Sequence, residues 1–399
     1  MKALSDLLVL DFTHVLSGPY ATMLLADLGA RVLKIEPPGE GESTRKLLAQ
    51  DPEHSVAGMG AYFLTLNRNK RSIAIDLKTE EGRSLVHRLA AKADVVVNNF
   101  SRGVPERLGI SHARLAERNP RIVTCSITGF GETGPAADRA AFDMVAQGIG
   151  GGMSLTGEAG GRPLRAGIPI GDLGGGLFAA LGILAALHAR ELTGRGQHVD
   201  ISMLDGQISL LNYIATMALL SGRNPVALGN AHGVHVPYDT FRTATRPLIL
   251  AVITDDFWAA LVEVLDLPAL RDPALTTQPG RLARKDFIAE TIQAALMRES
   301  CAVWLERLGA KRIPCAPVND VLTALSDPQV LARQMVAAVA HPSGRSVKMP
   351  GNPVKLSETH EESFSPPPAL GEHTDAVLTE LLGLSAAEIA GLRARGAVG

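Results

Sequence analysis

The first third of the chain alternates short apolar segments of strand length with segments of helical periodicity. The strand candidates are residues 7–12, 31–35, 72–77, 94–97 and 122–127, and the helix candidates are residues 20–28, 80–92 and 112–118. Strands separated by helical segments are typical of parallel sheets with crossover helices. The pattern therefore predicts an α/β fold whose large domain is Rossmann-like and doubly wound. In such a domain, ligands bind beyond the carboxyl ends of the strands.

The length of 399 residues exceeds the size at which one hydrophobic core usually keeps growing, so we expect two domains. After residue 222 a loop-like stretch leads into a hairpin pattern at 237–253 and helical patterns at 255–264, 285–296 and 302–308. The expected division is a large Rossmann-like domain at 1–224, a smaller α+β domain at 225–325, and a segment at 326–399 that returns to the large domain. That segment contains a strand candidate at 351–357 and a C-terminal helix pair.

Composition excludes several classes of function. The net charge of −2 gives no basic footprint for nucleic acid. Cys125, Cys301 and Cys315 lie far apart without metal-ligand spacing, which predicts reduced thiols, no metal site and a cytoplasmic protein. The N-terminal segment is a poor signal peptide because Asp6 interrupts it. The first strand–helix turn lacks G-x-G-x-x-G, so a nicotinamide or flavin dinucleotide site is unsupported.

Asp172 precedes a run of uncharged residues at 173–187 that is rich in glycine and alanine. The run is shorter than the ~20 apolar residues that span a bilayer, so we expect a buried helix rather than a membrane contact. An Asp at a helix start ordinarily caps the free backbone N–H groups. A carboxylate at the entrance to an apolar helix also suits a nucleophile in a dry site. The segment alone leaves both interpretations open.

Several segments together resemble the family III CoA-transferases, the CaiB/BaiF family. They include VLDFTHVLSGPYATMLLADLGARVLKIEPPGEGESTR at 9–45, LNRNKRSIAIDLKTEEGR at 66–83, GFGETGPAADRAAFDMVAQGIGG at 129–151 and LTGRGQHVDISMLDG at 192–206. The order and spacing of these segments carry the resemblance across nearly the whole chain. It implies an interlocked homodimer that acts on an acyl-CoA and a small carboxylic acid, without a permanently bound cofactor.

By this resemblance Asp172 is the nucleophile that forms an anhydride with the acyl group and then a thioester with CoA. The glycines behind it, Gly174 and Gly175, are expected to leave room for the thioester and to offer N–H groups to an oxyanion. The resemblance also assigns a set of CoA-binding residues. They are His14, Val15, Leu16, Ser17, Leu66, Asn67, Asn69, Lys70, Asn99, Phe100, Ser101, Arg107, Arg139, Phe142 and Asp143. Met203 is expected to pack at the edge of the pocket.

Three features bear on the substrate. The 2-methylacyl-CoA racemases of the family carry a catalytic His where Phe142 stands, and a phenyl ring cannot move protons. The formyl-CoA branch has a Gln in place of Leu16 and a glycine-rich loop that we do not find at 219–246, which argues against formyl-CoA and oxalate. His232, His235 and Tyr238 lie in a loop that suits the distal carboxylate of a dicarboxylate, with His232 and Tyr238 as the expected contacts.

We therefore expect a CoA-transferase with succinyl-CoA as donor and a dicarboxylic acid as acceptor. The alternatives are an acyl-CoA racemase or isomerase and, from another class, a non-catalytic nucleotide-binding protein.

Overall fold

The computed structural model describes residues 2–359 and 363–399, which form two compact units. Unit 1 comprises Met1–Gly152, Arg165–Ser221 and Gln329–Gly399, and unit 2 comprises Met153–Leu164 and Gly222–Pro328. The second unit thus includes residues 153–164, which the sequence pattern assigned to the large domain. That short segment pairs with the start of the later one, where the Gly229 N–H donates to the Gly157 carbonyl.

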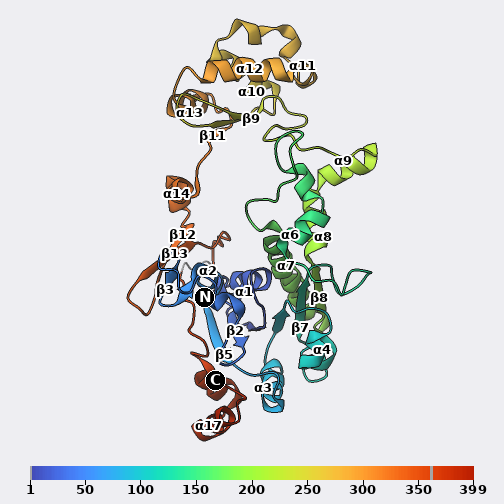
Figure 1. The fold of residues 1–399 in the computed structure, drawn as a ribbon, viewed down its shortest axis with the longest axis vertical. Coiled ribbons are helices and arrows are strands. Elements are labelled where there is room, and N and C mark those ends of the chain that lie inside the picture. The colour runs from blue at the N-terminus through green and yellow to red at the C-terminus, as the bar shows by residue number, and fades with distance from the viewer. Residues whose placement is uncertain (1, 360–362) are drawn as a thin grey trace. The chain divides into compact units, whose positions relative to one another are not determined.

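Unit 1 is built on a sheet of six parallel strands (Figure 1). Across the sheet the order is β5 (Lys70–Ala74), β2 (Arg31–Glu36), β1 (Leu8–Asp11), β6 (Val95–Asn98), β7 (Val123–Thr128) and β8 (His198–Ser202). From β1 the chain moves outward to β2 and β5, and then returns to the other side of β1 at β6. This order confirms the doubly wound parallel sheet, and it places the switch point between β1 and β6.

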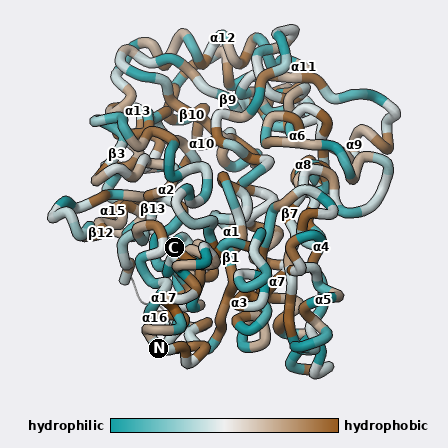
Figure 2. The backbone as a smooth tube through the Cα atoms, turned by 60° about the horizontal axis from the view of Figure 1, so that its bottom comes forward, coloured by the Kyte–Doolittle hydropathy of each residue, from teal (hydrophilic) through white to brown (hydrophobic). Residues whose placement is uncertain are grey.

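Helices cover both faces of this sheet because alternate strand residues point to opposite sides. On one side Val9 of β1 packs in a core with α1 (Ser17–Asp27) and α7 (Ile170–Thr193). On the other side Leu10 packs in a core with α3 (Glu80–Ala90), α16 (Thr374–Leu382) and α17 (Ala386–Ala394). Figure 2 shows hydrophobic stretches in the strands of the sheet and in the helices beside them.

Helix α7 has 24 residues, more than the predicted apolar run. Among the described residues it is the one helix that is long and apolar enough to cross a membrane, and the bent pair α8–α9 would pass only as a single broken span. Half of the most apolar window of α7 is buried in the structure, and core helices satisfy the same criterion. Gly176 lets α7 approach α1 closely, because a Cβ there would lie 2.6 Å from the Ser17 carbonyl oxygen.

The C-terminal segment of unit 1 begins with an antiparallel hairpin of β12 (Val336–Ala340) and β13 (Ser346–Pro350). The strand predicted at 351–357 is therefore wrong, because the pairing ends at Pro350 and the following residues form irregular structure. The predicted helix pair is present as α16 and α17. It is anchored to the sheet by the His373 N–H, which donates to the Ser72 carbonyl, and by the Gly399 N–H, which donates to the Ala74 carbonyl.

Unit 2 has a three-stranded antiparallel sheet in the order β11 (Cys315–Pro317), β10 (Leu248–Ala251) and β9 (Tyr238–Phe241). The predicted hairpin is thus present as β9–β10. Helices α10 (Asp255–Leu265), α12 (Lys285–Leu296) and α13 (Cys301–Ala310) pack on it through a core that contains Trp258 and Trp304.

The remaining elements are short and connect the larger ones. They are η1 (Ser43–Arg45), β3 (Ser55–Val56), β4 (Met59–Gly60), α2 (Ala61–Leu66), α4 (Val104–Leu108), α5 (His112–Ala116), α6 (Asp143–Ile149), η2 (Gly152–Leu155), α8 (Met203–Leu211), α9 (Tyr213–Ser221), η3 (Pro268–Arg271), η4 (Pro273–Leu275), α11 (Gln278–Ala283), α14 (Val321–Leu325) and α15 (Pro328–Ala332).

Candidate active site

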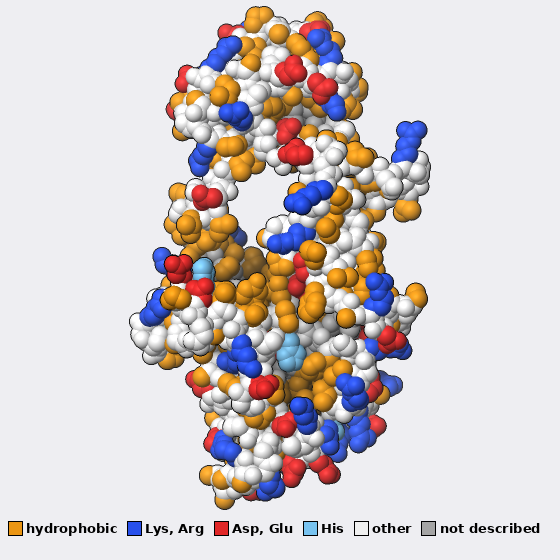
Figure 3. Space-filling model, viewed as in Figure 1, with side chains coloured by type: hydrophobic (Ala, Val, Ile, Leu, Met, Phe, Trp, Pro, Cys, Tyr) orange, Lys and Arg blue, Asp and Glu red, His pale blue; other side chains and the backbone are white. Residues whose placement is uncertain are grey.

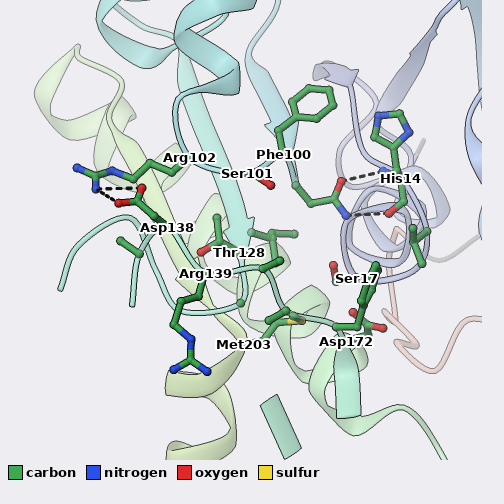
Figure 4. A pocket seen from close by; sticks show the side chains of 18 residues that line it. His14, Ser17, Phe100, Ser101, Arg102, Thr128, Asp138, Arg139, Asp172 and Met203 are labelled. Atoms are coloured by element: carbon green, nitrogen blue, oxygen red, sulfur yellow. Dashed lines mark hydrogen bonds and ion pairs between the residues drawn. The ribbon is translucent and has the colours of Figure 1, made fainter. Parts of the chain in front are cut away.

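A cavity of about 250 Å³ opens in unit 1 at the carboxyl ends of β1, β6 and β7 (Figure 4). This is the switch point of the sheet, where a doubly wound fold binds its ligands. The loops after the strands supply most of the walls. The lining residues are His14, Val15, Ser17, Asn99, Phe100, Ser101, Arg102, Ile127, Thr128, Gly129, Ala137, Asp138, Arg139, Ala140, Ala141, Phe142, Asp172 and Met203.

The loop after β1 is held rigidly at the pocket wall. The His14 N–H donates to Asn99 Oδ1 at 2.8 Å, and Asn99 Nδ2 donates to the His14 carbonyl at 2.7 Å. Val15 has a φ of 64°, which is rare for a β-branched residue, and its N–H donates to the buried Glu42 carboxylate. Burial and the neighbouring Lys34 lower the pKa of His14 to about 4, so its imidazole is neutral at pH 7.

A buried ion-pair network lies beneath this loop. Lys70 Nζ contacts Asp11 Oδ2 at 3.0 Å, and both side chains are fully buried. Burial alone would raise the pKa of Asp11, but Lys70 and Lys34 outweigh it and hold that pKa far below its usual range. Asp11 also accepts from the Thr13 N–H, and Lys34 Nζ donates to the Thr13 carbonyl. The network therefore fixes the residue before His14.

The structure places only part of the expected CoA-binding set at this pocket, and the set as a whole stays a prediction. Leu66, Asn67 and Lys70 do not line the pocket, because their side chains are buried and Lys70 is held by Asp11 and Asn67. The remaining expected residues outside the lining are Leu16 at the start of α1, Asn69, which bonds to Asp27 and Ser365, Arg107 on the exposed side of α4, and Asp143 on α6. His14, Val15, Ser17, Asn99, Phe100, Ser101, Arg139 and Phe142 do line it, as does Arg102.

Asp172 is the third residue of α7 and lines the pocket. It does not cap the helix, so the capping interpretation is wrong. The N–H groups of Gly171 and Asp172 instead donate to Asp143 Oδ1, at 2.8 and 3.3 Å. Within the described residues, no side chain or backbone group donates to the Asp172 carboxyl. Burial, and then the negative charge of Asp143, raise the pKa of Asp172 to about 6.

The glycines after Asp172 have a packing role. Gly174 and Gly175 are buried inside α7, where each N–H belongs to the helical hydrogen-bond ladder. These N–H groups thus have helical acceptors, and the expectation that they stabilise an oxyanion stays a prediction. A Cβ on Gly175 would lie 3.2 Å from Met203 Cγ, so the missing side chain makes room for this pocket residue. In Figure 4, Asp172 lies close to Ser17 and Met203.

Two guanidinium groups lie at the pocket. Arg102 makes a long, exposed ion pair with Asp138 at 3.4 Å, and the guanidinium of Arg139 lies 5.0 Å from the centre of the Phe130 ring. Neither group is buried in a strong pair, so both are available to a negatively charged ligand. Phosphate and carboxylate groups are the ligands that a guanidinium binds best.

Unit 2 contains a separate cavity of about 200 Å³, lined in part by His232, His235, Tyr238 and Lys285. His232 Nδ1 accepts from the N–H groups of Val234 and His235, which leaves Nε2 as the donor. The His232 ring lies 4.7 Å from that of His235 and 5.3 Å from that of Tyr238, centre to centre. The loop residues named from the sequence thus form one aromatic and polar cluster.

The fold and the pocket define an α/β enzyme with a carboxylate set against apolar walls and cations nearby. The chain belongs to CoA-transferase family III, whose sequence profile matches residues 4–374. It is therefore a CoA-transferase, as the resemblance in its sequence implies.

Individual relatives cover nearly the same length. The chain is 40% identical to the acetyl-CoA:oxalate CoA-transferase of Acetobacter aceti over 365 residues, or 90% of this chain and 91% of that protein. It is 35% identical to the human succinyl-CoA:glutarate CoA-transferase over 383 residues, or 96% of this chain and 86% of that protein. The crystal structure of a CaiB/BaiF family protein from Brucella suis matches with a TM-score of 0.84 and 36% identity, covering 95% of this chain and 99% of that one.

Proposed function

We propose that this enzyme moves CoA from succinyl-CoA to a small dicarboxylic acid through covalent intermediates on Asp172. The observation that carries the proposal is the Asp172 carboxyl itself, which lines the switch-point pocket without a hydrogen-bond donor or cationic partner among the described residues. A carboxylate left free in this way is available to attack a thioester.

The proposed reaction proceeds in four balanced steps. An Asp172 oxygen attacks the thioester carbon, the C–S bond breaks, and a mixed anhydride and CoA thiolate form. The thiolate attacks the Asp172 carbonyl, which gives an aspartyl-CoA thioester and releases the donor acid as its carboxylate. The acceptor carboxylate attacks this thioester and yields a second anhydride and thiolate. The thiolate then attacks the acceptor carbonyl, so that acyl-CoA leaves and the Asp172 carboxylate is regenerated.

The pocket chemistry supports these steps. With a pKa of about 6, Asp172 is mostly ionised at pH 7 and more basic than an ordinary aspartate, which strengthens it as a nucleophile. Ile127, Phe142 and Met203 form apolar walls around it. An anhydride is destroyed by water, so an apolar surround favours transfer over hydrolysis. Arg102 and Arg139 are proposed to bind the phosphates of CoA.

The choice of a dicarboxylate is supported by the relatives. The human relative is named for succinyl-CoA and glutarate. We propose that His232 and Tyr238 bind a carboxylate group, since both line the unit 2 cavity beside Lys285. The Acetobacter aceti relative is named for acetyl-CoA and oxalate, so acetyl-CoA and oxalate belong in any test of specificity even though Leu16 and the absent glycine-rich loop argue against oxalate.

A donor and acceptor screen by mass spectrometry tests the proposal. Purified enzyme is incubated with succinyl-CoA or acetyl-CoA and a panel of acids from oxalate to adipate, with Asp172→Asn as the control. The proposal predicts new acyl-CoA products from succinyl-CoA and C4–C6 dicarboxylates, and none from the variant. Transfer only to monocarboxylates would overturn the acceptor class, and transfer only to oxalate would overturn the preference for C4–C6 acids. An active variant would overturn the mechanism.

The racemase alternative is tested in the same assay format. Phe142 lines the pocket and is 71% exposed in the structure, so a phenyl ring occupies the place of a base. A pure (S)-2-methylacyl-CoA in deuterated water is therefore expected to keep its configuration and its α-hydrogen. Rapid exchange would favour the racemase interpretation instead.

We also propose that the enzyme is the interlocked homodimer that the resemblance implies. Apolar side chains are exposed on unit 1 around α6, α7 and α8 (Figure 3), and Leu219 and Leu220 at the end of α9 are about 85% exposed. Surfaces of this kind are typical of protein interfaces. Tagged and untagged enzyme mixed under native conditions should form almost no mixed dimer over hours. Rapid exchange, or a monomer at micromolar concentration, would contradict this assembly.

A further inference from the structure

Two side chains of α6 hold the backbone that leads into α7. Asp143 Oδ1 accepts from the N–H groups of Gly171 and Asp172. Gln147, one helical turn later and buried, donates from Nε2 to Asp143 Oδ2 at 2.7 Å and accepts from the Ala166 N–H at 2.9 Å. Together the pair fixes three backbone groups of residues 166–172, directly before and at the proposed nucleophile.

The first turn of α7 depends on these hydrogen bonds to a neighbouring helix. Its N-cap residue is Pro169, which makes no side-chain capping bond. Gly171 fits only without a side chain, since a Cβ there would lie 2.9 Å from Asp143 Oδ1. Asp143 therefore does the work that a Ser, Thr or Asp at the N-cap does in other helices.

We propose that Asp143 is the positioning residue of the nucleophile: it caps α7 from a neighbouring helix and so leaves the Asp172 carboxyl free to react. This inference rests on the proposed role of Asp172. Asp172 stands at the third helical position, in the first turn, where the backbone N–H groups lack helical acceptors and attract an acidic side chain. Because Asp143 already occupies those donors, Asp172 has no competing partner and stays in the pocket.

The negative charge of Asp143 has a second consequence. It lies against Asp172 and opposes its ionisation, which keeps the attacking oxygen basic. The other titratable or charged groups that line the pocket around Asp172 are His14, Arg102, Asp138 and Arg139. These groups are unchanged by a substitution at 143, so a shift in the pH profile of such a variant reports on Asp143 itself.

The test compares three variants with the wild type in steady-state and single-turnover assays with succinyl-CoA. Asp143→Ala removes the cap, and we expect kcat to fall by roughly 10²-fold with KM for succinyl-CoA nearly unchanged, because misplacement of a reacting group by about 1 Å costs that much. Asp143→Asn keeps an acceptor for α7 but turns an N–H toward Gln147 Nε2. Asp143→Asn with Gln147→Glu restores that hydrogen bond and an acceptor for Ala166, and we expect it to recover most of kcat with the pH midpoint of acylation below that of the wild type.

Asp375→Asn is the matched control, since it neutralises an acid in the first turn of another helix of unit 1, α16. A value of kcat for Asp143→Ala within about threefold of wild type would overturn the inference while leaving the proposed function intact. If Asp143→Ala fails to fold, the other two variants provide the test. Equal kcat values for Asp143→Asn and for the double variant would then overturn the inference. Activity in Asp172→Asn would instead overturn the proposed function.

Discussion

Asp11 is fully buried and Asp172 half-buried in unit 1, and their surroundings are opposite. Asp11 accepts hydrogen bonds from Thr13 and Thr22 and pairs with Lys70. Asp172 has another carboxylate beside it and no donor to its carboxyl among the described residues. Burial raises the pKa of either group, but only Asp11 has cations that reverse the effect. A carboxylate with hydrogen-bond donors and a cationic partner stabilises the fold, whereas a carboxylate without them is available for catalysis.

The two carboxylates also serve the same pocket by different routes. Asp11 accepts a hydrogen bond from Thr13 and so fixes the loop that carries His14, although Asp11 itself does not line the pocket. Asp172 lines the pocket itself. Neutralising each one should therefore produce different losses, of stability for Asp11 and of activity for Asp172.

The largest expected effect is the loss of transfer in Asp172→Asn. An amide cannot form the anhydride, so kcat should fall by roughly 10³-fold or more, as for other covalent nucleophiles. CoA binding, measured by calorimetry, should stay within about threefold of wild type because the proposed phosphate contacts, Arg102 and Arg139, are unchanged. A variant that kept a tenth of the wild-type rate would show that Asp172 is not the nucleophile and that it does not differ from Asp11 in this way.

The next effect is on stability. Asp11→Asn leaves the buried Lys70 ammonium without its ion-pair partner, and breaking such a pair costs about 3–5 kcal/mol. Urea denaturation followed by circular dichroism should show this loss, while Asp172→Asn should be as stable as the wild type or more so. A loss below about 1 kcal/mol in Asp11→Asn would mean that the ion pair contributes little.

The pH dependence of stability should also differ between Asp172 and Asp11. Since the pKa of Asp172 is raised from 3.8 to about 6, the folded protein holds the extra proton in this range, and its stability falls as pH rises through it. Asp172→Asn lacks this loss, so its advantage over wild type should grow by about 1–2 kcal/mol between pH 4 and pH 7. Asp11, whose pKa is lowered, contributes stability that is full above about pH 4 and lost in acid. An advantage independent of pH would show that the pKa of Asp172 is not raised.

The smallest expected effect concerns the cations. Lys70 is buried in an ion pair with Asp11, whereas Arg139 lines the pocket without a buried partner. Arg139→Ala should raise KM for succinyl-CoA by about tenfold with little change in kcat, the value of one or two charge-assisted hydrogen bonds. Arg107→Ala, on the exposed side of α4, should change KM by less than about twofold. The reverse order would favour the contact that the family resemblance assigns to Arg107.

The sequence predicted the parallel sheet well because apolar strands and amphipathic helices are local patterns. Residues 153–164 were misassigned because their pairing with Gly229 is a long-range contact without a local signal. The burial of Lys70 has no local signal either: its basic side chain is visible in the sequence, but its buried partner Asp11 is 59 positions away. Asp143 was named as a CoA contact. Its bond to the start of α7 depends on how two helices pack, although an acid in the first turn of a helix is itself a visible signal.

Covalent modification of Asp172 during turnover can be detected by a trapping experiment. The enzyme is incubated with succinyl-CoA alone, treated with hydroxylamine, digested and mapped by mass spectrometry. The account predicts a hydroxamate on Asp172 that depends on succinyl-CoA and is absent in Asp172→Asn, with Asp11 unmodified. An enzyme that turns over while Asp172 stays unmodified, or a hydroxamate on another carboxylate, would contradict it.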